Sequence, residues 1–335
     1  MNVRKTGTET FRNEDEGRLR MPWRIVLGLV VVGIASVVVS GLVNSLLSLV
    51  GVNPFDPGLE EFTGFDGGLT AFVMGATMLV ALWPIGRYVD RRQFADFGLE
   101  INCDWWADFG FGLLLGAALP TAIFLIGWTA GWYSVTGTFV AETAFLPSLV
   151  ILVLFFTAVS IGEELLLRGW LLTNLAEGFR LWGERIAAGL SILGSSLVFG
   201  LVHLGNPNVS LFAVAITLLA GVWFGLAYVL TGRLGIPIGG HITWNAFIGS
   251  FYGLPVSGVE FGLTFVAVDV AGPDWATGGG YGPEAGVLGA AALMAGILAI
   301  GWWAKRQEGQ IAIHPDIAAP ALRESGRKPA TREGG

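Results

Sequence analysis

Charged residues and cysteines are scarce in this chain of 335 residues. Only 13% of the residues are charged, and Cys103 is the single cysteine. One cysteine excludes an internal disulfide framework and a metal site built from several thiolates. The net charge of −7 gives no support for a nucleic-acid partner. Hydrophobic residues make up 53% of the chain and the mean hydropathy is +0.65, so we expect the lipid bilayer to be its main solvent.

The apolar residues come in runs that match the thickness of a bilayer. A helix needs about 20 consecutive apolar residues to cross the hydrocarbon core. Such stretches lie roughly at 25–51, 67–86, 109–133, 146–172, 186–204, 209–230, 234–254 and 285–304. The first stretch is too long for the apolar region of a signal peptide, which has about 7–15 residues. The sequence therefore predicts an all-α integral membrane protein, a bundle of about eight transmembrane helices.

The distribution of Lys and Arg predicts the orientation of this bundle. Short cytoplasmic loops of membrane proteins carry an excess of basic residues. Apart from Arg168, the basic residues precede the first stretch, follow the eighth, or lie between the second and third, fourth and fifth, or sixth and seventh. The loops 52–66, 134–145, 205–208 and 255–284 contain neither Lys nor Arg. We therefore predict a multi-pass protein of the cell membrane, with both termini in the cytoplasm and an external, glycine-rich loop at 255–284.

Ionisable residues inside the apolar stretches are informative, because a charge in the middle of a bilayer is costly and rare without a function. The fourth stretch contains Glu163, Glu164 and Arg168. Glu164 and Arg168 are i, i+4 neighbours in the favourable order and are expected to pair. Glu163 lies about 100° around the helix, where it is free to face a cavity. The alternative is a structural ion pair that joins helices, with Glu163 reaching toward the cytoplasm.

Two of the three histidines also lie in apolar stretches. His203 follows Phe199 by four residues in the fifth stretch, and His241 precedes Asn245 by four residues in the seventh. This spacing places each pair on one face of a helix. A single histidine in an apolar helix is often a hydrogen-bonded packing residue, but a second one with an amide one turn away favours a polar site. The two glycines before His241 are predicted to allow close helix packing.

Together these motifs resemble those of the CPBP intramembrane proteases. That family includes the type II CAAX prenyl endopeptidases, the lysostaphin-resistance-protein-A-like proteins and the bacteriocin-immunity proteins. Its members carry Glu-Glu-x-x-x-Arg, Phe-x-x-x-His and His-x-x-x-Asn or Asp on successive helices of an eight-helix bundle, and the resemblance covers roughly residues 145–250. The motif residues of this chain are Glu163, Glu164, Arg168, His203, His241 and Asn245.

The resemblance implies an intramembrane endopeptidase that acts on a membrane-anchored protein or peptide. Peptide hydrolysis needs a base for water, stabilisation of the oxyanion and a proton for the leaving amine. The resemblance assigns activation of the water to Glu163 and His203, and stabilisation of the oxyanion to His241 and Asn245. We favour a mechanism without a cofactor. The alternative is catalytic zinc held by Glu163, His203 and His241, a set of two imidazoles and one carboxylate.

The polar ends and apolar stretches, together with the resemblance over the core, suggest how the chain is divided. We expect a cytoplasmic polar tail at 1–22, three N-terminal transmembrane helices at 23–144, the catalytic core at 145–254, the external loop and last transmembrane helix at 255–306, and a disordered cytoplasmic tail at 307–335. Two other functional classes stay open. An ion-coupled transporter would also hold charges inside a bundle, and a non-catalytic scaffold or immunity factor could keep the same residues for packing.

One estimate from the sequence conflicts with a shared site. At a rise of 1.5 Å per residue, His241 lies about 10 Å from the predicted cytoplasmic edge, whereas His203 lies more than about 20 Å from it. Straight, upright helices would keep the two histidines apart. A tilt, a kink near Gly194 or Gly200, or a helix start in the membrane plane around 180–188 would bring them together.

Overall fold

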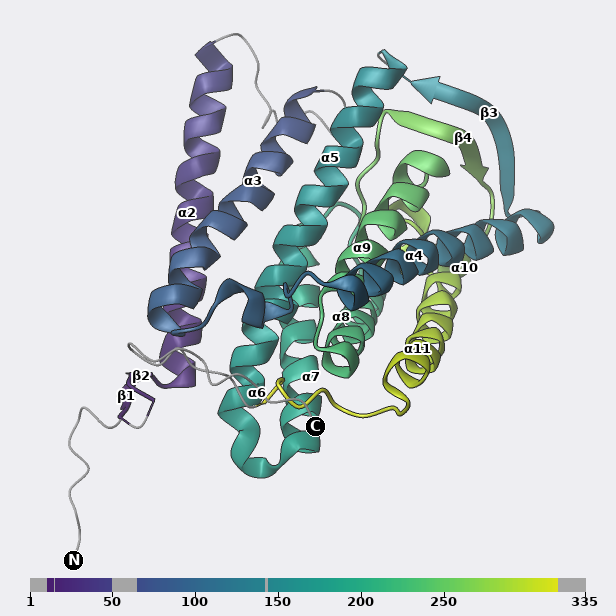
Figure 1. Cartoon of the computed structure of the whole chain (residues 1–335). Helices are drawn as coiled ribbons and strands as arrows, with labels where there is room; N and C mark the ends of the chain where they lie inside the picture. The colour runs from purple at the N-terminus through teal and green to yellow at the C-terminus, as the bar shows by residue number, and fades with distance from the viewer. Residues whose placement is uncertain (1–10, 15, 50–64, 142–143, 319–335) are drawn as a thin grey trace, which may run out of the picture.

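The computed structural model describes residues 11–14, 16–49, 65–141 and 144–318 and is 74% helical (Figure 1). The α-helices of this part of the chain are α2 (Met21–Leu49), α3 (Phe65–Pro84), α4 (Cys103–Thr129), α5 (Phe145–Glu164), α6 (Thr173–Phe179), α7 (Glu184–Val202), α8 (Leu211–Thr231), α9 (Gly235–Ala246), α10 (Asp274–Thr277) and α11 (Val287–Glu308). The π-helical turns are η1 (Ile85–Val89), η3 (Leu165–Leu172) and η6 (Phe247–Phe251), and the 3-10 turns are η2 (Phe94–Phe97), η4 (Arg180–Trp182), η5 (His203–Gly205), η7 (Gly279–Tyr281) and η8 (Pro283–Ala285). The strands are β1 (Arg12–Asn13), β2 (Arg18–Leu19), β3 (Tyr133–Ala141) and β4 (Leu263–Val270).

Each predicted apolar stretch contains a helix. The helices are, in order, α2, α3, α4, α5 with η3, α7, α8, α9 with η6, and α11. Within the described residues, six segments are long and apolar enough to cross a membrane, namely α2, α4, the segment from α5 to η4, α7 with η5, α8 and α11. The predicted class, an all-α multi-pass membrane protein, is confirmed. The count of eight spans stays a prediction, because neither α3 nor α9 with η6 is among the six.

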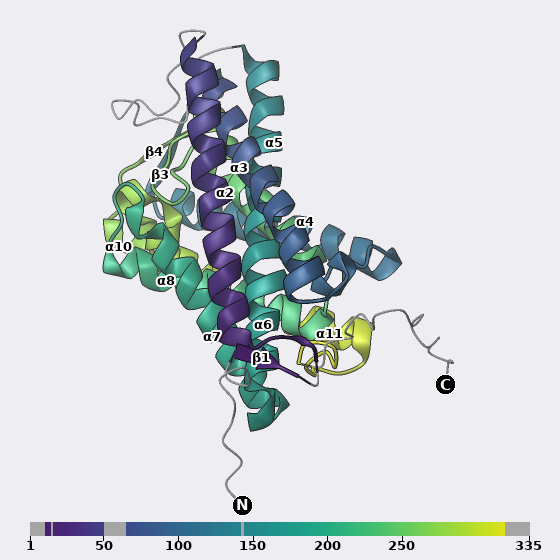
Figure 2. The same cartoon turned by 90° about the vertical axis from the view of Figure 1, so that its left-hand side faces the viewer.

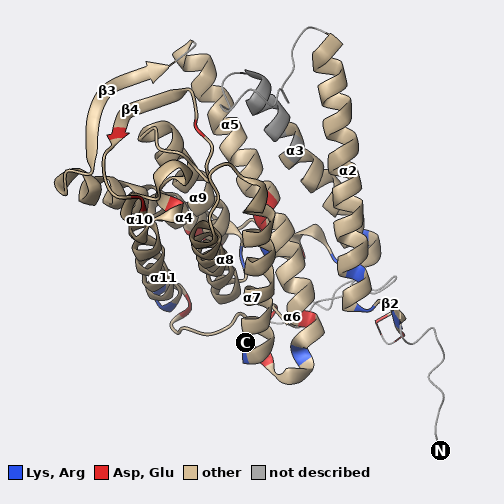
Figure 3. Cartoon of the chain, turned by 180° about the vertical axis from the view of Figure 1, so that it is seen from behind, with Lys and Arg blue, Asp and Glu red and all other residues tan. Residues whose placement is uncertain are grey.

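The helices are not all parallel. In Figure 1, α2, α3 and α5 stand side by side, and α4 crosses the bundle at a steep angle to them. In the turned view of Figure 2, α2 is the helix of this group that faces the viewer. Lys and Arg gather at the end of the bundle that holds β2, the hairpin between α6 and α7, and the last turn of α11 (Figure 3). The first and last described residues both lie toward this end, as an even number of spans requires. That this end faces the cytoplasm stays a prediction.

The position of α9 is set by its close packing against α4. A Cβ atom on Gly112 of α4 would lie 2.5 Å from the carbonyl oxygen of Ile236, and one on Gly239 of α9 would lie 2.4 Å from that of Phe109. Only glycine permits backbones to approach this closely. The expectation that a glycine before His241 serves helix packing is therefore confirmed, and this packing fixes the helix that carries two motif residues.

The loops contain structure that the sequence did not reveal. β3 and β4 pair antiparallel, with a bulge between Val135 and Gly137. The strands come from two predicted external loops that are far apart in the sequence, so no local pattern indicates their pairing. The resulting two-stranded sheet lies at the end of the bundle opposite to the gathered Lys and Arg (Figures 1 and 3).

Ordered structure also reaches into both predicted tails. Arg18 is only 3% exposed, and its Nη2 lies 2.6 Å from Glu177 on α6. After α11, the backbone N–H of His314 donates to the carbonyl oxygen of Val229, and Ile317 is 2% exposed within the core. The rest of the predicted tails, namely residues 1–10, 15 and 319–335, lies outside the described residues.

Candidate active site

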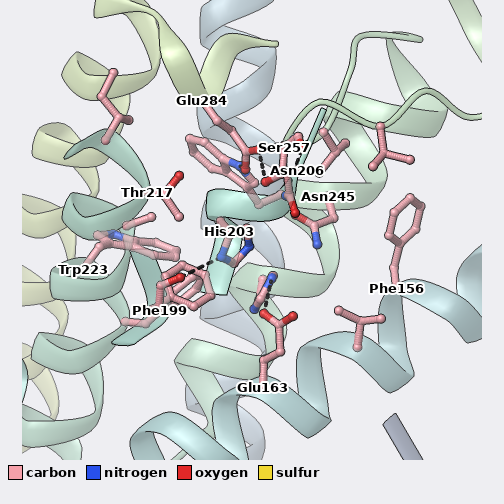
Figure 4. A pocket seen from close by; sticks show the side chains of 18 of the residues that line it. Phe156, Glu163, Phe199, His203, Asn206, Thr217, Trp223, Asn245, Ser257 and Glu284 are labelled. Atoms are coloured by element: carbon pink, nitrogen blue, oxygen red, sulfur yellow. Dashed lines mark hydrogen bonds and ion pairs between the residues drawn. The ribbon is translucent and has the colours of Figure 1, made fainter. Parts of the chain in front are cut away.

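The helices that carry the three motifs meet around a cavity of about 170 Å³ (Figure 4). Four motif residues line it: Glu163 at the end of α5, His203 in η5, and His241 and Asn245 on α9. Aromatic rings form much of the remaining wall, and they belong to Phe155, Phe156, Phe199, Trp223, Phe224, Trp244 and Phe261. The other two motif residues, Glu164 and Arg168, are fully buried beside it. The cavity is therefore a small apolar chamber with a few convergent polar groups, as ligand and active sites commonly are.

Glu164 joins two of the motifs. Its Oε1 accepts hydrogen bonds from Nη1 of Arg168 and from Nδ1 of His241, each at 2.9 Å. The pair with Arg168 agrees with the spacing, but no sequence pattern predicted the contact with His241, which is 77 residues away. A carboxylate paired with a guanidinium only accepts hydrogen bonds, so Nδ1 of His241 carries a proton. His241 therefore presents Nε2 to the cavity.

Glu163 points into the same space. Its side chain is 25% exposed, and its Oε2 lies 3.9 Å from Nε2 of His241. This distance exceeds that of a direct hydrogen bond. A separation of this size suits a water molecule or a substrate atom between the two groups. In Figure 4, Glu163 stands on one side of the cavity, with His203 and Asn245 further across it.

Phe199 has two separate roles. Its carbonyl oxygen accepts a hydrogen bond from Nδ1 of His203 at 2.7 Å. Nε2 is therefore the nitrogen of that ring that is not used in this contact. Its ring lies against the guanidinium of Arg168, with Cζ 4.5 Å from the ring centroid. Phe224 contacts the same guanidinium at 5.0 Å and stacks on His241 at 4.9 Å. The two rings thus cover the buried guanidinium of Arg168. They also contact the imidazoles, Phe199 that of His203 and Phe224 that of His241.

Asn245 lies one turn after His241 on α9 and is 8% exposed. Its side chain makes no hydrogen bond to another residue in the described part of the chain. Its amide therefore remains available to a molecule in the cavity.

The depth estimate from the sequence was wrong, because it assumed that all basic loops lie at one level. The hairpin of α6 and α7 extends well beyond the ends of α8 and α11 (Figure 1). α7 starts from this distant turn and runs as one helix from Glu184 to Val202. Its long path brings His203, just after its end, to the same cavity as His241.

A zinc site at Glu163, His203 and His241 stays a prediction. No group of three or more His, Cys, Asp or Glu side chains lies close enough to hold a metal ion within the described residues. The two imidazoles direct Nδ1 to protein acceptors, and only Glu163 and His241 face each other closely.

Comparison with protein families gives one match. Residues 143–247 match the family described as type II CAAX prenyl endopeptidase Rce1-like. The chain contains an Rce1-like domain. The match spans α5 to the start of η6 and includes all six motif residues, so the resemblance drawn from the motifs is confirmed. This match supports a protease at the level of the family. Comparisons with curated proteins and with solved structures found no match.

Sequence reasoning missed several residues of the cavity, some of them outside the Rce1-like domain. Trp244 and Phe224 lie within the domain but read as ordinary core aromatics. Ser257 and Glu284 follow it, and both line the cavity. Glu284 is the one acidic residue of this set, and its place in a glycine-rich loop next to Pro283 gave no signal of proximity to the motifs.

Proposed function

We propose that this protein is an intramembrane endopeptidase that hydrolyses a peptide bond of a membrane-anchored protein or peptide. The observation that carries the proposal is the position of Glu163. It is a partly exposed carboxylate that faces His241 across an otherwise largely apolar cavity, while Glu164 is occupied by Arg168 and His241. A partly exposed acid that has no Arg or Lys partner within the described residues has the access that a general base needs.

The proposed reaction begins with a water molecule beside Glu163. Glu163 removes a proton as the water oxygen attacks the carbonyl carbon of the peptide, and the carbonyl oxygen becomes an oxyanion. Glu163 then gives this proton to the leaving amine as the carbon–nitrogen bond breaks. The products are a carboxylic acid and an amine, and the base is regenerated.

His203 has the second proposed role in activating the water. Because Nδ1 donates to the carbonyl oxygen of Phe199, the neutral ring has a lone pair on Nε2. That lone pair can accept one hydrogen of the water and orient its oxygen toward the substrate. The other hydrogen then faces Glu163.

The oxyanion requires donors, and we assign them to His241 and Asn245. Asn245 offers its amide N–H without any change of state. His241 has committed Nδ1–H to Glu164, so it donates from Nε2 as the imidazolium cation. In that state His241 and Arg168 balance the charges of Glu163 and Glu164. Donors aimed at a developing charge in a site that excludes water contribute strongly to catalysis.

The cavity wall supports an apolar substrate. Phe155, Phe156 and Val159 come from α5, and Phe261 comes from the loop after η6. Such a wall suits an apolar side chain or a lipid chain near the cleaved bond. A membrane-associated protein, prenylated or otherwise lipid-anchored, is the substrate class that combines these properties.

The proposal is tested by comparing membrane proteomes of cells that express wild-type protein, Glu163→Ala or Glu260→Ala. Glu260 is an exposed acid of the loop after η6 and serves as the matched control. We expect one or more cleavage products with wild type and Glu260→Ala that are absent with Glu163→Ala. Identical product sets in all three would contradict the proposed activity.

A separate measurement decides between the metal-free mechanism and zinc. We expect protein purified without chelator to contain zinc far below one atom per molecule, and its activity to survive dialysis against a chelator. The same elemental measurement on His203→Ala and His241→Ala is the control. Near-stoichiometric zinc in wild type, lost in both variants together with activity, would contradict the metal-free mechanism.

A further inference from the structure

Glu284 makes a set of contacts that the proposed chemistry does not use. It lies in η8, just before α11, and lines the cavity from the side opposite to Glu163 (Figure 4). Its Oε1 accepts a hydrogen bond from Nε1 of Trp244 at 2.8 Å. Its Oε2 accepts two more, from the backbone N–H and the hydroxyl of Ser257, at 2.6 and 2.7 Å. One carboxylate therefore holds a residue of α9 and a residue of the loop after η6.

That loop forms one wall of the cavity. We call residues 255–261 the wall loop; Val256, Ser257, Val259 and Phe261 of it line the cavity. Val256 and Val259 exchange backbone hydrogen bonds in a tight turn. Between them, Ser257 has a φ of 50°, a left-handed conformation that is unfavourable for a residue with a side chain. The wall loop thus needs external contacts to keep this shape.

The contacts come from both sides of the loop. The side-chain amide of Asn206 donates to the carbonyl oxygen of Ser257 at 3.0 Å, and Asn206 directly follows η5, which begins with His203. A Cβ atom on Gly258 would lie only 2.0 Å from the carbonyl oxygen of Pro207. The wall loop is therefore packed against the segment after His203 on one side and tied to Glu284 on the other.

We propose that Glu284 is a positioning residue of the active site: it holds the wall loop against the cavity and joins it to the helix that carries His241 and Asn245. It does so through Trp244, the residue next to Asn245 on α9. A substrate that reaches Glu163 lies between Glu163 and the wall loop, so the wall loop forms the opposite side of the binding slot. This inference rests on the proposed function, and Glu284 lies beyond the residues that match the Rce1-like family.

Glutamine in place of Glu284 is the informative change. It has nearly the same shape, but its amide nitrogen donates and cannot accept. With its oxygen toward Ser257, its nitrogen faces the indole N–H of Trp244, and with the reverse orientation it faces the two donors of Ser257. In either orientation the contact with Trp244 or the contact with Ser257 is lost. We call these two contacts of Glu284 the clamp. In the first orientation the wall loop loses its link to α9, and in the second Ser257 loses both of its partners on residue 284, so in either case the wall loop should leave its position more often.

Loop opening can be measured without any activity assay. Cys103 is the single cysteine and is exposed, so a Cys103→Ser background allows a thiol to be placed at Val256, which is 6% exposed. We expect maleimide to label the Val256→Cys thiol about tenfold faster when Glu284→Gln is added, since loss of a hydrogen bond to a partly buried charge changes an opening equilibrium by about that factor. Glu260→Gln, the matched control on the same loop, should leave the labelling rate unchanged.

Measurements of peptidase activity distinguish a positioning role of Glu284 from a role in the chemical step. On a cleaved peptide, Glu284→Gln should raise KM about tenfold with a smaller change in kcat, because the binding slot is loosened while Glu163 is untouched. Ser257→Ala removes one of the three hydrogen bonds of Glu284 and should have a smaller effect in both assays. If Glu284→Gln folds poorly, the Ser257→Ala results test the positioning role in its place.

Labelling of Val256→Cys at the same rate with and without Glu284→Gln and Ser257→Ala would overturn the inference. Wild-type protein without any peptidase activity would contradict the proposed function instead, and the labelling rates would still report on the clamp.

Discussion

Two clusters of buried charge lie in this protein, and they are built differently. The first, which we call the N-terminal ion cluster, lies where the N-terminal segment, the turn after η1 and α6 meet. It consists of Arg18, Arg24, Asp90, Arg92 and Glu177, none more than 4% exposed. The second is the candidate active site, with Arg168, Glu163, Glu164 and His241. Both place charges in the protein interior, so burial alone does not distinguish a functional cluster from a structural one.

The difference lies in how the acids are paired. In the N-terminal ion cluster, Glu177 contacts Arg18, Arg24 and Arg92, and Asp90 contacts Arg24 and the indole of a tryptophan. Burial lowers the pKa of Arg92 to about 10, which still leaves it charged at neutral pH. Every acid there is matched by guanidinium groups, so none is available to another molecule.

The candidate active site has one guanidinium for two acids. One guanidinium, that of Arg168, serves Glu164, and Glu163 has no Arg or Lys partner within the described residues. Glu163 is also the acid that lines the cavity. A network with matched charges stabilises the fold, whereas a network that leaves one accessible acid can do chemistry.

The largest effect expected from this comparison is on turnover. Glu163→Gln should lower kcat by about 10²- to 10⁴-fold, the usual contribution of a general base, with an unchanged melting temperature in detergent. Activity and thermal unfolding of the same preparation measure both. Arg168→Ala provides the contrast, because it strands the buried Glu164. A melting temperature lowered as much by Glu163→Gln as by Arg168→Ala would make Glu163 a structural residue.

The next effect is on stability. Glu177→Gln leaves three guanidinium groups with one partner fewer, and breaking a buried ion pair in this way costs about 3–5 kcal/mol. We expect a large loss in the free energy of unfolding, measured by denaturant titration in detergent, while the rate per folded molecule stays that of wild type. A stable Glu177→Gln protein with a lowered rate would show that the two clusters are functionally coupled.

The smallest effect belongs to the exposed edge of the N-terminal ion cluster. Arg180, whose side chain is 41% exposed, pairs with Glu16. Burial alone would raise the pKa of the Glu16 carboxyl, but hydrogen bonds from Arg180 and Arg18 outweigh it and hold this pKa below its usual value. Arg180→Gln should cost about 0.2–1 kcal/mol, as for other exposed pairs.

The pH dependence of this pair has a definite sign. Because the folded pKa of Glu16 is lower than the unfolded value of 4.5, the stabilisation is complete above that value and is lost as pH falls through the folded pKa. Wild type and Arg180→Gln should therefore converge in melting temperature on acidification below the unfolded value. A gap that stays constant over this range would contradict the assignment.

Local features were predictable, and features that depend on packing between segments were not. The apolar stretches, the pair of Glu164 with Arg168 and the glycine contact of α9 all follow from helical periodicity or from a close approach that only glycine allows. The pairing of β3 with β4 and the ordered segments before α2 and after α11 depend on partners far along the chain. The same holds for the long α6–α7 hairpin, whose length misled the depth estimate.

By itself, the sequence determined that the chain lies in a membrane, that an acid and a guanidinium pair within one helix, and that two histidines accompany them in apolar helices. Helical geometry repeats every few residues, so such relations are encoded locally. Only the tertiary structure decided that Glu164 bridges to His241, that Phe199 and Phe224 cover Arg168, and that Glu284 closes the far wall of the cavity. Those contacts join segments tens of residues apart, and their geometry depends on how the helices pack against one another rather than on any spacing along the chain.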